Sequence, residues 1–168
     1  MFHIRPVTRA STTLQGHTEA VLNTAFSPDG TKLASASGDR TVRLWDLNTE
    51  TPEHTMEGHK GWVMYVAFSP DGTILASAGA DNNVFLWDPE TGEQKGPVLK
   101  GHKKFVTSLA WEPLVKANKY KRFASSSKDF TVRIWSADNF QMIRALGGHT
   151  SSVAKVIWGG EGLLYSAS

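Results

Sequence analysis

Short runs of alternating apolar and polar residues cover the chain and are separated by turn signals. Residues 41–45 alternate with a period of two and are rich in β-branched and aromatic residues, which is typical of a β-strand. The turn at 27–30 reads Ser-Pro-Asp-Gly, in which proline fixes φ for the bend and glycine accepts a positive φ. The first repeat predicts strands at 21–26, 32–37 and 41–45, with a weaker outer strand at 53–56. No helical periodicity appears, so we expect an all-β fold.

The same unit recurs along the chain. The dipeptide Gly-His begins at positions 16, 58, 101 and 148, with gaps of 42, 43 and 47 residues. A segment ending in Trp-Asp or Trp-Ser follows each of the first three dipeptides. A period in the low forties, opened by Gly-His and closed by Trp-Asp, indicates one four-stranded propeller blade per repeat.

The repeats divide the chain into three blades and half of a fourth. We expect the segments to be an N-terminal stretch at 1–15 with a candidate ring-closing strand at 10–14, blades at 16–57, 58–100 and 101–147, and an incomplete blade at 148–168. The ring is not closed within these residues, and the expected fold is a partial propeller. Exposed strand edges and an unfinished blade predict that the isolated chain associates with itself or aggregates.

The net charge of +2 hides an uneven distribution. Residues 1–94 carry 6 Lys/Arg against 12 Asp/Glu, and residues 95–133 carry 10 against 2. The third repeat has five extra residues within 112–122, and insertions in a repeat map to loops. This basic zone is either a solvated lysine-rich loop or a contact for a phosphate-rich or acidic partner.

Composition excludes several classes of protein. The chain has 168 residues, 20% charged and 10% aromatic, which is a globular composition rather than a disordered one. Without cysteines there are no disulfides or thiolate metal sites, and a reducing compartment is compatible. No apolar run reaches about 18 residues, so no membrane contact is expected. The first residues lack the apolar core of a signal peptide.

The recurring motifs resemble those of the WD-repeat family. The resemblance rests on Gly-His, Ser-Pro-Asp-Gly, Leu-Ala-Ser, Asp-x-Thr-Val-Arg and Leu-Trp-Asp, which recur in register over nearly the whole chain. That family forms circular propellers, commonly with seven or eight blades. It implies a buried hydrogen-bond network in each blade, formed by His before the first strand, Ser on the second, Asp in the next turn and Trp on the third.

The implied network positions occur in three blades. They are His17, Ser35, Asp39 and Trp45; His59, Ser77, Asp81 and Trp87; and His102, Ser125, Asp129 and Trp135. In the first blade the choice between Ser35 and Ser37 stays open. A His, Ser and Asp set also has the residue types of a nucleophilic triad, but a catalytic set is rarely present once per repeat. We therefore expect a structural role and no enzymatic activity.

The resemblance also implies a partner-binding top face. Carried over by position, its informative members are Leu22, Trp62, Met64, Phe105, Thr107 and Lys128. Aromatic residues and Met are enriched where proteins bury contacts. The alternative is that these side chains pack on neighbouring loops. The basic loop is expected on the opposite face, where its candidates for a contact with RNA or an acidic partner are Lys116, Lys119, Lys121 and Arg122.

A narrower resemblance is to WD-repeat factors of large-ribosomal-subunit assembly. It rests on residues 2–9, 46–52, 111–114 and 158–168, the last two being unusual for a generic blade. It implies a non-catalytic scaffold in the pre-60S particle, acting in the nucleolus or nucleus, with the cytoplasm as the alternative. Its partners would be proteins of that particle and rRNA through the basic loop. Such factors also carry a ubiquitin-like domain engaged by the ATPase midasin; because these residues contain no such domain, we expect no midasin contact.

The same residues leave one alternative function open and disfavour others. Another WD-repeat adaptor, such as a ubiquitin-ligase substrate receptor or a signalling scaffold, fits the same motifs. A hydrolase using His and Ser is disfavoured by the repetition. The Gly-His histidines lie 42 or more residues apart with no second ligand at short spacing, so no metal is expected. The glycines at 159–162 lack a following phosphate-binding Lys, and no cofactor is expected.

Overall fold

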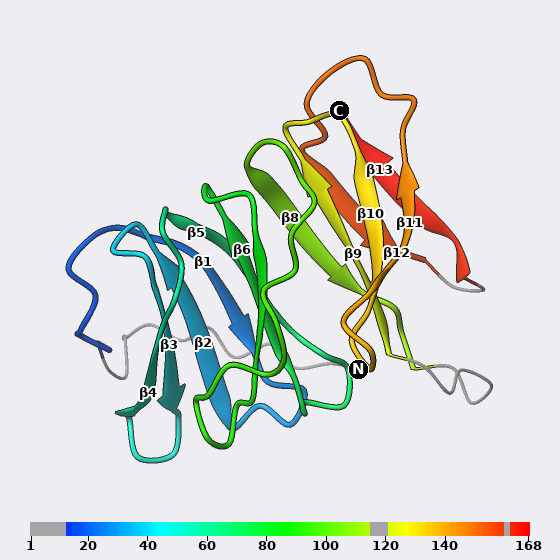
Figure 1. The fold of residues 1–168 in the computed structure, drawn as a ribbon. Coiled ribbons are helices and arrows are strands. Elements are labelled where there is room, and N and C mark those ends of the chain that lie inside the picture. Colours follow the sequence, from blue (N-terminus) through cyan, green and yellow to red (C-terminus); the bar gives the residue numbers. More distant parts are fainter. Residues whose placement is uncertain (1–12, 115–120, 160–161) are drawn as a thin grey trace, which may run out of the picture.

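The described residues form four antiparallel sheets that stand side by side in chain order (Figure 1). The computed structural model describes residues 13–114, 121–159 and 162–168. Blade 1 comprises β1 (Val21–Phe26), β2 (Lys32–Ser37), β3 (Thr41–Asp46) and β4 (Thr51–Glu57). Blade 3 comprises β8 (Val106–Trp111), β9 (Arg122–Ser127), β10 (Val132–Ser136) and β11 (Met142–Leu146). Blade 4 contains β12 (Lys155–Trp158) and β13 (Leu164–Ala167).

Blade 2 has a shorter sheet than its neighbours. It contains β5 (Val63–Phe68), β6 (Leu75–Gly79) and β7 (Val84–Trp87). In the place of a fourth strand the chain makes only two isolated bridges, Val84 to Leu99 and Trp87 to Gln94. Between them Gly96 has φ 76°, and Pro97 has no N–H to donate, so a continuous ladder cannot form. The fourth strand expected for this blade is therefore reduced to bridged backbone.

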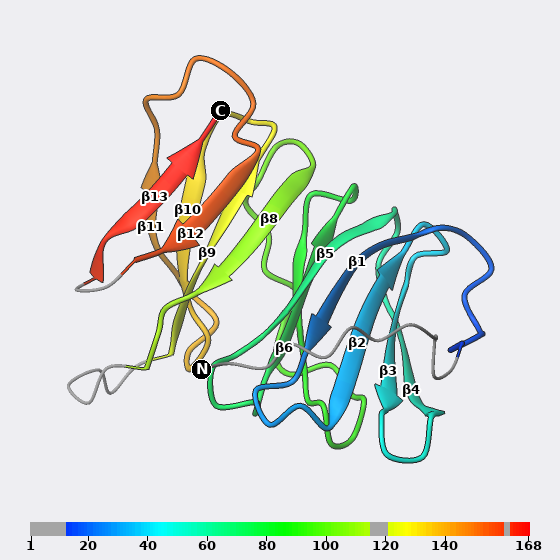
Figure 2. The same ribbon diagram turned by 180° about the vertical axis from the view of Figure 1, so that it is seen from behind.

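The hydrophobic core lies between successive sheets rather than inside one of them. The cluster between blades 1 and 2 joins Leu44 and Met56 to Val66 and Trp87. A second cluster lies between blades 2 and 3, and a third joins blade 3 to blade 4. The first strands β1, β5, β8 and β12 contact one another in sequence along one side of the arc (Figure 2). Each blade therefore buries its apolar faces only against its neighbours, as in other repeat proteins.

The all-β prediction is confirmed: the described residues contain strands and no α-helix. Within the same residues no helix is long and apolar enough to cross a membrane. The predicted closing strand at 10–14 lies outside the described residues except for Thr13 and Leu14, which are not in a strand.

Candidate functional site

A chain of hydrogen bonds crosses the sheet of blade 1. The indole N–H of Trp45 donates to Ser35 Oγ at 2.9 Å, and that oxygen lies 2.7 Å from His17 Nε2. On the other side of the ring, His17 Nδ1 lies 2.8 Å from Asp39 Oδ2. These distances suit an imidazole that donates from Nδ1 to the carboxylate and accepts from the serine hydroxyl at Nε2. Ser37 has a different role, since its hydroxyl donates to the carbonyl of Glu19.

The same contacts recur in the next two blades at 2.7–2.9 Å. They join His59, Ser77, Asp81 and Trp87 in blade 2, and His102, Ser125, Asp129 and Trp135 in blade 3. The structure thus brings together all twelve residues that the sequence singled out as networks. The repeat places these side chains in the same way in each blade, because His precedes the first strand, Ser lies on the second, and Trp lies on the third.

The network carboxylates are held in their charged form. Burial alone would raise the pKa of Asp39, but hydrogen bonds from Thr41, His17 and the N–H of Thr18 outweigh it and hold the pKa well below its usual range. The same balance lowers the pKa of Asp129. Burial lowers the pKa of His102, and the neighbouring Asp129 only partly opposes it. A neutral histidine beside a charged aspartate is therefore the stable state of the blade 3 network at neutral pH.

The geometry does not present a serine hydroxyl to a substrate. Asp, His and Ser are linked in the order of a nucleophilic triad. However, Ser77 and Ser125 are completely buried, and each hydroxyl oxygen already accepts the indole N–H of its blade. A nucleophile needs a reachable lone pair, so the arrangement suits a network that links strands rather than one that attacks a substrate.

The ends of the sheets that carry Ala20, Trp62 and Phe105 form one rim of the arc. Each of these carbonyls accepts a backbone N–H from the turn between the second and third strands, at 3.0, 2.8 and 2.9 Å. We call this end the upper rim: residues 13–22, 38–40, 58–64, 80–83, 100–107, 128–131 and 147–154. The repeated hydrogen bond shows that equivalent positions lie at equivalent places in the three blades.

A β-bulge lies at the start of the first strand in each complete repeat. The register shifts fall between Val21 and Asn23, between Val63 and Tyr65, and between Val106 and Ser108. The extra residues are Leu22, Met64 and Thr107. A bulge leaves one residue unpaired and re-aims its side chain. Three of the six predicted top-face positions are therefore the bulged residues of the upper rim.

The predicted top-face residues differ in how much surface they offer. Trp62 is 58% exposed, Leu22 43% and Phe105 41%. Met64 and Thr107 are half-buried, and the Thr107 hydroxyl donates to the carbonyl of Val153 at 2.6 Å. Thr107 therefore joins blades 3 and 4. Lys128 is exposed, and its ammonium lies 5.2 Å from the centroid of the Phe105 ring.

The described residues of the basic segment, 112–114 and 121–122, lie at the opposite end of the sheets, the lower rim. Lys121 Nζ lies 2.5 Å from the carboxylate of Asp71 in the neighbouring blade. Arg122 donates two bonds of 2.6 Å to Glu112, whose side chain is only 4% exposed. The other two predicted members, Lys116 and Lys119, lie outside the described residues. The two described members are thus already paired with carboxylates, which the sequence did not indicate.

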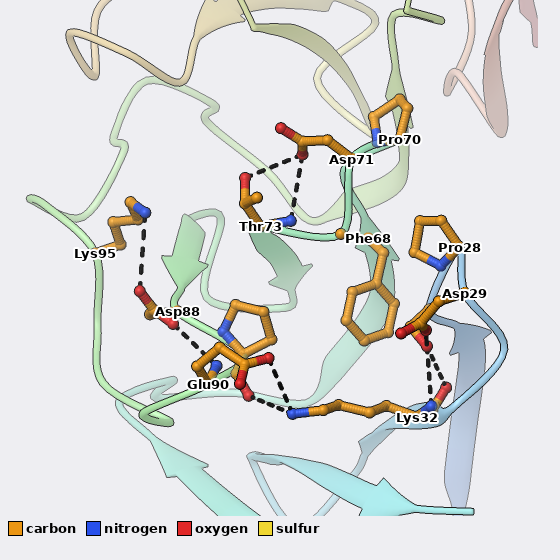
Figure 3. A pocket seen from close by; sticks show the side chains of 13 residues that line it. Pro28, Asp29, Lys32, Phe68, Pro70, Asp71, Thr73, Asp88, Glu90 and Lys95 are labelled. Carbon is orange, nitrogen blue, oxygen red and sulfur yellow. Dashed lines mark hydrogen bonds and ion pairs between the residues drawn. The ribbon is translucent and has the colours of Figure 1, made fainter.

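A pocket of about 380 Å³ opens between the lower turns of blades 1 and 2 (Figure 3). Lys32 crosses it and contacts Glu53 at 2.8 Å and Glu90 at 3.2 Å. Across the pocket, Lys95 approaches Asp88 at 3.8 Å. Both lysines of the pocket are held by carboxylates, and the lining adds Asp29 and Asp71, so the pocket is an acidic, polar seam between two blades.

Sequence reasoning missed three residues that the structure gathers at the upper rim of blade 3. Lys103, Lys104 and Phe130 are all exposed, and the Lys104 ammonium lies 5.3 Å from the centroid of the Phe130 ring. The excess of lysine in residues 95–133 could have indicated these residues. The sequence prediction instead used only the lysines of the insertion at 112–122, which lie in the other part of that basic stretch. No group of three or more His, Cys, Asp or Glu in the described ranges is placed to hold a metal ion.

The fold and its repeated network define a WD-repeat propeller. The WD domain, G-beta repeat family matches residues 9–46, 50–88 and 94–136. The chain belongs to the WD-repeat family. The fold agrees with the solved structure of the RRP9 WD40 repeats, with a TM-score of 0.79 and 24% identity over 86% of this chain and 43% of that one.

Within the family, the similarity to particular relatives extends over the whole chain. Protein Notchless of Drosophila melanogaster is 61% identical over 168 residues, which is 100% of this chain and 34% of the relative. Ribosome assembly protein 4 of Saccharomyces cerevisiae is 46% identical over 93% of this chain and 31% of the relative. The chain spans about a third of the length of these relatives.

A different kind of match covers only one repeat. Cell division cycle 20.6, cofactor of APC complex, of Arabidopsis thaliana is 55% identical over 42 residues, or 25% of this chain. A match of this length shows only that the two proteins share the sequence motif of one blade. The similarity to Notchless also includes the segments between the motifs, so it reports more than the fold. The narrower resemblance predicted from the sequence, to WD-repeat factors of ribosome assembly, is confirmed by these relatives.

Proposed function

We propose that this chain is a non-catalytic interaction scaffold in the assembly of the large ribosomal subunit, acting in the nucleolus or nucleus. The observation that supports it most is the 61% identity to Notchless across all 168 residues, including the irregular segments that no blade requires. The similarity to a protein named for ribosome assembly adds to it. A propeller adaptor of another pathway would share the blade motifs without sharing these segments.

The partner surface in this proposal is the upper rim. Trp62, Phe105 and Leu22 expose large apolar side chains there, although apolar side chains of soluble proteins usually lie inside. Met64, Thr107 and Lys128 complete the set. Exposed aromatic residues on rigid strand ends are the usual anchors of protein interfaces. Partners on this face would be proteins of the pre-60S particle.

The basic segment at 112–122 has a smaller part in the proposal. Lys116, Lys119, Lys121 and Arg122 stay a predicted contact for RNA or an acidic partner. Because Lys121 and Arg122 are paired with Asp71 and Glu112, a partner there would have to compete with existing ion pairs. A midasin contact stays outside the proposal.

Co-sedimentation tests the scaffold role. An epitope-tagged protein is followed through sucrose gradients of nuclear extract, and its fractions are probed for large-subunit precursor rRNA. We expect the protein to migrate with the precursor particles and to leave them when the particles are dissociated. Recovery in light fractions with a cullin-type ligase or a signalling complex would reject the ribosomal role in favour of another adaptor.

A further inference from the structure

The upper rim of blade 3 combines exposed rings with exposed lysines in one place. Phe105 is 41% exposed and Phe130 40%. Lys128 lies over the first ring and Lys104 over the second, at 5.2 and 5.3 Å from the ring centroids. A pocket of about 220 Å³ opens between this rim and the adjacent turn of blade 2, lined by Asn82, Lys103, Lys104, Phe105 and Lys128. We call these five residues and Phe130 the blade 3 patch.

The backbone of the patch is held in place by the buried network below it. The N–H of Lys103 donates to Asp129 Oδ2 at 2.9 Å, the same oxygen that His102 contacts. The carbonyl of Lys104 accepts from the hydroxyl of Ser127 at 3.0 Å. The patch is thus presented on rigid strand ends, which lowers the entropy lost on binding a ligand.

The positive charge of the patch is not neutralised locally. In the described part of the chain, no carboxylate lies within 4 Å of the ammonium groups of Lys103, Lys104 or Lys128. At the lower rim, by contrast, Lys121 and Arg122 are both paired. Unlike these two described lower-rim residues, the three upper-rim lysines have free ammonium groups, which attract phosphates.

We propose that the blade 3 patch binds single-stranded RNA, with bases stacking on Phe105 and Phe130 and phosphates contacting the three lysines. Every base has a π-face, so exposed rings interleaved with lysines suit a single strand of any sequence. A duplex offers no free base faces to these rings.

An acidic peptide is the competing polyanion. Its carboxylates would use the lysines but would gain nothing from two phenyl rings placed beside them. The rings therefore favour RNA. The inference rests on the proposed role in ribosome assembly, and it assigns the blade 3 part of the upper rim to RNA, which leaves Leu22, Trp62 and Met64 as the protein-binding part of that rim.

Fluorescence anisotropy with a labelled 12-nucleotide oligouridylate tests the proposal on the purified full chain. Binding is measured at several KCl concentrations. For single strands, each phosphate contact contributes about −0.7 to the slope of log K against log salt. The triple variant K103Q/K104Q/K128Q should reduce the steepness of that slope by about 2. The double variant F105L/F130L should bind at least about tenfold more weakly with the slope unchanged, because each base stack lost is worth about 1–3 kcal/mol.

The matched control removes the same charge from other faces of the molecule. The variant K95Q/R144Q/K155Q should keep the slope and the affinity within about twofold of the unmodified chain. Circular dichroism spectra and melting curves of all variants establish that they fold. Equal weakening by the control and by the patch triple would overturn the proposal, because it would show attraction to net charge alone.

A second probe separates RNA from an acidic peptide. A labelled deca-glutamate peptide should bind at least about tenfold more weakly than the RNA. Equal binding of the peptide, insensitive to F105L/F130L, would overturn the proposal in favour of an acidic protein partner. Failure here leaves co-sedimentation with precursor particles as an independent measurement, so the two proposals can fail separately.

Discussion

The serine at the centre of each network allows a direct test of what the network contributes. Ser77 is fully buried, and its oxygen accepts the indole N–H of Trp87 at 2.7 Å and contacts His59 Nε2 at 2.8 Å. In Ser77→Ala the indole nitrogen of Trp87 and Nε2 of His59 both lose their hydrogen-bond partner. Leaving a buried polar group unpaired costs about 1–3 kcal/mol. We therefore expect the free energy of unfolding to fall by about 2–4 kcal/mol.

The matched control is another fully buried serine on a strand. The hydroxyl of Ser108 has no hydrogen-bond partner among the described residues. Removing an unpaired hydroxyl relieves a cost, so Ser108→Ala should leave stability unchanged or raise it. Urea denaturation followed by circular dichroism measures both variants, and Tm should fall by roughly 5–15 °C for Ser77→Ala alone. Equal stability of the two variants would refute the reasoning.

Three further predictions follow from the ionisable groups and the exposed edges. The pKa of His102 is lowered by burial, so on acidification the unfolded chain binds a proton at this histidine before the folded chain does. The stabilisation that comes from keeping His102 neutral is therefore complete above about pH 6.5 and is lost as the pH falls below that value. Asp129, whose pKa is also lowered despite its burial, adds a loss below about pH 4. Tm should therefore drop from pH 8 to pH 5 and again below pH 4, and a flat profile would count against both assignments. Arg122→Ala leaves the buried carboxylate of Glu112 unpaired and should cost about 2 kcal/mol in urea denaturation, a figure reduced because Arg122 is partly exposed; an unchanged midpoint would show that the pair is dispensable. Phe26 is 66% exposed on β1, an edge strand of its sheet, so the isolated chain should sediment as more than a monomer, and a sharp monomer would contradict this.

The network could be predicted from the sequence because it repeats. Gly-His, the serine strand, the turn aspartate and Trp recur at matching positions, and a constellation present once per blade indicates a structural role. The sequence left Ser35 and Ser37 as alternatives, because both lie on the same strand two residues apart. The structure distinguishes them by position along the strand: the hydroxyl of Ser35 lies beside His17, whereas that of Ser37, nearer the upper rim, donates to the carbonyl of Glu19.

The sequence could not predict which basic side chains are paired with carboxylates and which are free to bind a partner. The lysine-rich insertion indicated a basic underside, yet Lys121 pairs with Asp71, which lies 50 positions earlier in the chain. Contacts between blades connect residues one repeat apart, and no local pattern reports them. Lys103, Lys104 and Phe130 were missed for the same reason, since their grouping with the predicted Phe105 and Lys128 depends on loops brought together by folding.

The central claim is that the buried networks build the propeller while exposed rim residues bind partners in ribosome assembly. The most direct test compares the unmodified protein with Trp62→Ala by co-sedimentation with large-subunit precursors, with Tm measured in parallel. Trp62 is 58% exposed on the upper rim and belongs to no network. We predict that Trp62→Ala keeps its Tm but is largely lost from the precursor fractions. Undiminished association of this variant, or absence of the unmodified protein from those fractions, would contradict the account.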